Sequence, residues 1–202
     1  MKLGLIIGSH RPQSQSAKVA DRAIEFLREI HPETQIFRLE LAKAGIPMWD
    51  EGVWDGDLEW KKIWDPIAAQ LQSCDGFVVV SPEYSGMVPA ALKNFFLLAG
   101  KEEVGHKPGL IVAVSSGRGG AYPVVELRMS SYKNTRINWI PEHMIVRNCE
   151  NVLNHREGHS EDDKFARVRL TYCLKVLCEY AKALKQVRSS GVLDYTNHPN
   201  GL

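Results

Sequence analysis

The sequence lacks a surplus of either charge, any long apolar run and any closely paired cysteines. Lysine and arginine number 25 against 24 aspartates and glutamates, for a net charge of +1. This balance provides no attraction toward nucleic acid or an anionic membrane, so we expect neither as a partner. No segment approaches the ~20 apolar residues of a membrane-spanning helix. The apolar stretch after Met1 is also too short for a signal peptide.

Two further absences narrow the class of protein. The four cysteines, Cys74, Cys149, Cys173 and Cys178, form no CxxC pair and have no zinc-site spacing. Scattered thiols are typical of reduced core residues, so we expect a cytoplasmic protein without a metal site. The chain also has no GxxxxGK[ST] and no GxGxxG motif. The absence of both motifs argues against a nucleoside-triphosphate-binding loop and against a Rossmann pyrophosphate-binding turn.

Short apolar runs alternate with amphipathic stretches along the chain. The apolar runs predict strands at 2–8, 35–41, 76–81, 109–115 and 137–146. The amphipathic stretches predict helices at 14–30, 59–72, 89–99, 121–134 and 161–188, with a loop over 42–58. Strands that alternate with helices predict a parallel sheet covered on both faces. We expect a single domain over 1–188, and a polar tail over 189–202 that is mobile or used in subunit contacts.

The loop after the first predicted strand, residues 8–16, carries three serines and one arginine. Ser9, Ser14, Ser16 and Arg11 precede or begin a predicted helix, whose first N–H groups are unpaired. A helix N-terminus with hydroxyls and a guanidinium suits a phosphate group. The simpler alternative is a helix cap, which needs only one such serine.

The loops after the third and fourth predicted strands are also rich in turn residues. Residues 81–89 contain Pro82, Tyr84 and Gly86. Such a segment can contact the edge of a flat heterocycle through main-chain donors and acceptors. Residues 115–120 read SSGRGG, whose glycines let the backbone approach a ligand closely. Each loop taken alone is equally consistent with an ordinary turn. Parallel sheets bind ligands outside the carboxyl ends of their strands, where all three loops should meet.

Three segments together resemble the NADPH-dependent FMN reductase family, which includes azo, quinone and chromate reductases. They are GSxRxxS from Gly8, SPEYxxxxPxxLKN from Ser81 and SSGRGG from Ser115. The resemblance covers residues 1 to about 145 and includes the Ile46-Pro47-Met48-Trp49-Asp50 loop. It implies a flavodoxin-like, three-layer α/β/α fold with a five-stranded parallel sheet of order 2-1-3-4-5.

The resemblance also implies an FMN-containing oxidoreductase. Hydride would pass from NADPH or NADH through the flavin to a small-molecule acceptor, namely a quinone, an azo compound, a metal ion or a flavin. A homodimer or homotetramer is expected. No catalytic side chain is expected, because the hydride transfer is the cofactors' own chemistry.

The family pattern assigns cofactor-binding roles residue by residue. The FMN phosphate would lie at Ser9, Arg11, Ser14, Gln15 and Ser16; the isoalloxazine and ribityl region would lie at Pro82, Glu83, Tyr84 and Ser85; and the pyrimidine end would lie at Ser116, Gly117, Arg118, Gly119 and Gly120. Two positions depart from the pattern. Ser85 replaces the usual asparagine, and Phe95-Phe96 stands where the family commonly has an aspartate.

Two other functions stay open at this stage. A flavodoxin electron carrier would share the fold, although such carriers typically have a TxTGxT loop and strong acidity, which this chain lacks. A regulatory module that binds another phosphorylated ligand would also share the fold. Oxidation of NAD(P)H with a quinone would separate an enzyme from both alternatives.

Overall fold

The computed structural model describes residues 1–155 and 157–201 and contains one five-stranded sheet. Its strands are β1 (Lys2–Ile7), β2 (Gln35–Glu40), β3 (Gly76–Pro82), β4 (Pro108–Val114) and β5 (Asn138–Val146). All neighbouring strands are parallel, in the order β2-β1-β3-β4-β5. This arrangement confirms the predicted flavodoxin-like topology and places a switch in strand order between β1 and β3.

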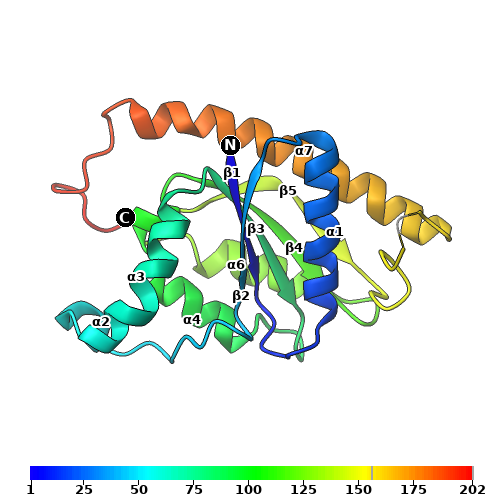
Figure 1. The fold of residues 1–202 in the computed structure, drawn as a ribbon, viewed down its shortest axis with the longest axis horizontal. Coiled ribbons are helices and arrows are strands. Elements are labelled where there is room, and N and C mark those ends of the chain that lie inside the picture. The colour runs from blue at the N-terminus through cyan, green and yellow to red at the C-terminus, as the bar shows by residue number, and fades with distance from the viewer. Residues whose placement is uncertain (156, 202) are drawn as a thin grey trace.

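The helices form a layer on each face of the sheet. They are α1 (Gln15–Ile30), α2 (Gly52–Asp55), α3 (Leu58–Gln72), α4 (Ala90–Leu98), α5 (Lys101–Val104), α6 (Ala121–Ser130) and α7 (Glu161–Ser189). Helices α1 and α7 cover one face, and α3, α4 and α6 cover the other (Figure 1). The predicted loop over 42–58 contains α2, and α5 was not predicted. Both have only four residues, too few for a periodic pattern to be recognised.

The two faces of the sheet follow from the alternation of side chains along each strand. In β1, Leu3, Leu5 and Ile7 point toward α1 and α7, whereas Ile6 points toward α3 and α4. Strands β3 and β4 are buried along their whole length, as their unbroken apolar runs predict. The four cysteines are free and buried in this core, as expected from their scattered positions.

The tail after α7 lies against the body of the protein. The Tyr195 ring is 5.2 Å from the Lys101 ammonium and 4.8 Å from the Arg136 guanidinium carbon. The same guanidinium donates to the carbonyls of His198 and Asn200. The tail therefore packs where the chain enters β4 and β5, at the amino end of the sheet. In the residues that the structure describes, no helix is both long and apolar enough to cross a bilayer.

Backbone pairing continues past the carboxyl ends of the strands. Three N–H groups donate to the neighbouring strand, from Gly8 to Val80 (2.8 Å), from Glu83 to Val114 (2.9 Å) and from Ser115 to Val146 (2.9 Å). The loops that follow β1, β3 and β4 therefore start at one level of the sheet. That level is the lower edge in Figure 1, where the loop from β1 to α1 turns upward.

Close packing around Gly8 constrains the position of the first loop. A Cβ atom at this position would lie 2.7 Å from Leu92 Cδ2 and 3.1 Å from the Val80 carbonyl oxygen. Gly8→Ala should therefore lower the free energy of unfolding by ~1–3 kcal/mol, because β3 or α4 must shift. Urea denaturation should be compared with Gly117→Ala, whose Cβ would meet nothing within 4 Å. Equal stability of the two variants would contradict the packing constraint.

Candidate functional site

A small cavity opens where the loops after β1, β3, β4 and β5 meet, and its volume is about 160 Å³. Predicted site residues on its wall are Arg11, Ser14, Gln15, Ser16, Pro82, Glu83, Tyr84 and Ser116. Residues on the wall that were not predicted are Val114, Cys149 and Glu150. The structure thus brings the first two predicted loops, and the edge of the third, to one cavity at the switch in strand order.

The start of α1 supplies buried polar groups to this cavity. Ser14 is the N-cap, and its Oγ accepts a hydrogen bond from the Ala17 N–H (3.1 Å). Ser16 is only 1% exposed, and neither its hydroxyl nor Gln15 Oε1 has a hydrogen-bond partner among the described residues. Buried polar atoms without a partner are uncommon and unfavourable. A bound anion at the helix start would give the Ser16 hydroxyl an acceptor.

Ser9 lies behind the cavity wall and contacts the second loop. It is fully buried, its hydroxyl is hydrogen-bonded to the Tyr84 hydroxyl (2.8 Å), and its Oγ accepts from the Arg11 N–H (3.1 Å). The His10 ring lies edge-on to Tyr84, with a centroid distance of 5.2 Å. Ser9 is absent from the cavity wall and instead joins the first loop to the second.

Glu83 connects the second loop to the third. Its Oε2 accepts the Gly120 N–H at 2.7 Å, and a Cβ at Gly119 would come within 2.3 Å of the same oxygen. From the other side, Arg147 Nε donates to the carbonyls of Arg118 (2.8 Å) and Gly119 (3.1 Å). A side chain at position 119 would therefore displace the Glu83 carboxylate from its contact with the third loop.

The predicted pyrimidine-contact loop lies mostly outside the cavity wall. Ser116 lines the cavity, but Gly117, Gly119 and Gly120 do not. Arg118 lines a neighbouring cavity of about 560 Å³, which it shares with Arg147. Only a ligand that extends beyond the small cavity could reach these residues.

Ser85 lies at the tip of a tight turn. The N–H and carbonyl groups of Tyr84 and Met87 pair with each other at 3.0 Å, and Ser85 and Gly86 have φ values of +52° and +76°. Two consecutive positive φ angles are typical of a type I′ turn, in which asparagine is favoured. The replacement of the family's usual asparagine by Ser85 therefore affects how readily the backbone adopts this turn. The Ser85 side chain is exposed and does not line the cavity.

Asn94, the last residue of the LKN motif, has a structural role that its sequence context does not predict. It is 4% exposed, its Oδ1 accepts the Trp49 N–H (2.7 Å), and its Nδ2 donates to the Pro47 carbonyl (2.7 Å). The LKN motif in α4 thereby fixes the Pro47–Trp49 loop. The adjacent Phe95 is 1% exposed and packs edge-on to Trp64. At this position the difference from the family pattern therefore concerns a core residue.

The charges at the cavity are mixed. Arg11 supplies a guanidinium group, whereas Glu83 and Glu150 supply carboxylates. Burial raises the pKa of the Cys149 thiol, which favours the protonated, unreactive form. The cavity therefore has groups that can bind an anion through hydrogen bonds and one cation. Among the described residues on its wall, the one thiol is not activated.

The chain matches a known protein family over most of its length. The model of the NADPH-dependent FMN reductase family matches residues 1–150. The chain is 26% identical over 189 residues to the NADPH azoreductase of Bacillus sp. (strain OY1-2), covering 93% of this chain and 97% of that protein. It is 27% identical over 121 residues to the 2-hydroxy-1,4-benzoquinone reductase of Burkholderia sp., covering 58% of this chain and 62% of that protein.

The fold is also similar to that of solved flavoenzymes. The NAD(P)H:(acceptor) oxidoreductase FerB from Paracoccus denitrificans superposes with a TM-score of 0.67 at 17% identity, over 90% of this chain and 97% of that chain. This likeness concerns the fold alone. Because the family model spans most of the chain, the protein belongs to the NADPH-dependent FMN reductase family, and is an oxidoreductase that uses FMN and NAD(P)H.

Proposed function

We propose that this protein binds FMN with its phosphate in the cavity at the strand ends, and passes electrons from NAD(P)H to a quinone or an azo compound. The observation that carries the proposal is the meeting of Arg11 with the buried Ser16 hydroxyl, which has no partner among the described residues, at the start of α1. The named activities of the azoreductase and benzoquinone reductase relatives support these acceptor classes. Metal ions and free flavin are further candidate acceptors.

The size of the cavity decides which part of FMN it can hold. Sites that enclose a drug-sized ligand have volumes of roughly 300–1,000 Å³, whereas this cavity has about 160 Å³. It suits the phosphate end, and the isoalloxazine ring would extend outside it. This division agrees with the polar groups present, because hydroxyls and a helix N-terminus bind phosphate better than they bind a flat ring.

The residues of the first loop would bind and orient the phosphate. Arg11 would donate charge-assisted hydrogen bonds to the phosphate oxygens, and the N–H groups at the start of α1 would add donors and partial positive charge. The Ser16 hydroxyl would donate as well, which would satisfy a buried group that otherwise has no partner. Ser14 can still donate its hydroxyl hydrogen, because the capping bond uses only its oxygen.

The second and third loops would position the ring. Tyr84 is held by Ser9, and the third loop is held by Glu83, so both loops keep their places without a ligand. Main-chain N–H groups of residues 117–119 would then face the developing negative charge at the pyrimidine end of the ring. Bound FMN supplies the redox chemistry, since its N5 atom accepts a hydride from NAD(P)H and the electrons pass on to the acceptor.

A homo-oligomer, either a dimer or a tetramer, is part of this proposal. Tyr122, Val125 and Met129 recur along one side of α6 and are 69%, 61% and 70% exposed. Leu97 on α4 is also 63% exposed. A row of large apolar side chains on a helix surface is more typical of an interface than of a free surface.

The purified protein should be yellow or become so with FMN, and the loaded protein should oxidise NADPH or NADH when a quinone is supplied. A visible absorption spectrum and a stopped assay of NAD(P)H consumption check this expectation. A protein that is colourless after incubation with excess FMN and removal of the free flavin would contradict the binding proposal. A flavin-loaded protein that oxidises neither nucleotide would contradict the proposed reaction.

Arg11→Ala should weaken FMN binding by about ten- to a hundredfold, because it removes charge-assisted hydrogen bonds worth ~1.5–3 kcal/mol each. Quenching of flavin fluorescence during titration measures the dissociation constant. Arg28→Ala is the matched control, since Arg28 is an exposed arginine in the last turn of the same helix. If both variants bind FMN as the wild type does, the phosphate assignment is wrong.

A further inference from the structure

The segment after β5, residues 148–155, forms one wall of the cavity through Cys149 and Glu150. Its backbone is held away from ordinary conformations, because Asn148 and Leu153 have φ values of +45° and +59°. Leu153 is neither a glycine nor an asparagine, so its position costs conformational free energy. The segment must therefore be fixed by contacts with the rest of the protein.

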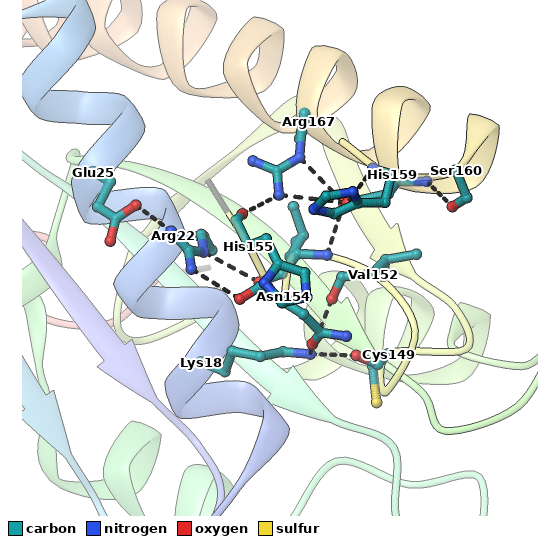
Figure 2. A network of polar contacts seen from close by, with 12 residues as sticks. Lys18, Arg22, Glu25, Cys149, Val152, Asn154, His155, His159, Ser160 and Arg167 are labelled. Carbon is teal, nitrogen blue, oxygen red and sulfur yellow. Dashed lines mark hydrogen bonds and ion pairs between the residues drawn. The ribbon is translucent and has the colours of Figure 1, made fainter. Parts of the chain in front are cut away.

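Lys18 on α1 provides the first of these contacts. Its ammonium group donates to the carbonyl of Cys149, to the carbonyl of Val152 (2.9 Å) and to Asn154 Oδ1 (2.6 Å). Figure 2 shows the Lys18 side chain pointing from α1 to these acceptors. An ammonium group has three N–H donors, so this single residue uses its full hydrogen-bonding capacity on one segment.

Arg22, one turn further along α1, continues the same contact. Its Nε donates to the Leu153 carbonyl (3.1 Å), and Nη2 donates to the Asn154 carbonyl (3.1 Å). Glu25 holds the guanidinium from the other side (Figure 2). The bonds from Lys18 and Arg22 join positions that are more than 130 residues apart in the sequence. We call these two residues the α1 clamp.

Helix α7 also contacts the same segment, through Asp163. Asp163, 3% exposed, accepts the Leu153 N–H at 2.8 Å and the His159 N–H at 3.3 Å. Although burial opposes ionisation, the hydrogen bonds from these backbone groups lower the pKa of Asp163 below its usual value. The segment is thus held between α1 and α7. The α1 clamp alone comes from the helix that also carries the cavity residues Ser14 and Gln15.

Lys18 and two cavity residues lie on the same helix, which connects Lys18 to the site. Lys18 lies one turn after Ser14 and three residues after Gln15, so the clamp fixes the distance between the start of α1 and the opposite wall of the cavity. We propose that Lys18 is a positioning residue for FMN, which holds the Cys149–Glu150 wall in place around the phosphate. The inference rests on the proposed placement of the FMN phosphate in this cavity.

A purely electrostatic role makes a different prediction. Lys18 lies close enough to Glu150 for the two charges to interact, so its ammonium could act by offsetting that carboxylate near the phosphate. In that case, Glu150→Gln should restore FMN binding in a Lys18→Met background. If Lys18 acts by positioning, the same change should leave the loss in place, because the wall remains unclamped.

Titration of apo-protein with FMN and with riboflavin, which lacks the phosphate, tests the proposal. Lys18→Met keeps the aliphatic stem, and should weaken FMN binding about tenfold or more while changing riboflavin binding less than about threefold. Lys62→Met is the control, because Lys62 is an exposed lysine of α3 that pairs only with Glu59 among the described residues. Hydrogen exchange at residues 150–154 should become faster in Lys18→Met and stay unchanged in Lys62→Met.

Three results would overturn the proposal. One is an unchanged ratio of FMN to riboflavin affinity in folded Lys18→Met, and another is recovery of that ratio by Glu150→Gln. Arg22→Met, which removes fewer bonds to the segment, should show a smaller loss in the same direction, and it replaces Lys18→Met if that variant does not fold. If Arg22→Met leaves the ratio unchanged in that case, the proposal is also wrong. A wild-type protein that binds neither flavin would instead show that the proposed function fails.

Discussion

The site depends on the parallel register of four strands at their carboxyl ends. The main-chain bonds from Gly8 to Val80 and from Ser115 to Val146 continue this register into the loops, so loops far apart in the sequence begin side by side. Strand order reverses between β1 and β3, where no crossover helix can cover the edge. A cavity is therefore built into the topology, and the loop sequences determine only what it binds.

Much of the motif sequence serves to fix the loops against one another. Ser9 pairs with Tyr84, Glu83 pairs with Gly120, and Asn94 holds the Pro47–Trp49 loop. These polar groups are buried or half-buried and satisfied within the protein. The Ser16 hydroxyl at the start of α1 differs from these groups, because it is buried and has no partner among the described residues. This difference leaves the Ser16 hydroxyl able to donate to a ligand in the cavity.

Periodicity predicted the five strands, and the family resemblance implied their order. Loop chemistry singled out the polar residues at the start of α1, whose role toward a phosphate stays a prediction. Neither periodicity nor loop chemistry could predict the Cys149–Glu150 wall, because residues 148–155 carry no recognisable motif and are fixed by side chains more than 130 positions away. The roles of Ser9 and Ser85 depend on burial and on a positive φ angle, and neither can be read from local sequence.

Phosphorus NMR of the FMN complex tests most directly whether the phosphate lies in this cavity. Free phosphate monoesters lose their second proton near pH 6. Arg11 and the start of α1 should favour the dianion and so lower that pKa, because opposite charge and donated hydrogen bonds stabilise the charged form. We therefore expect a resonance of bound FMN that stays constant between about pH 5.5 and 8. A resonance that titrates like that of free FMN would show that the phosphate is in solvent, and would contradict the account.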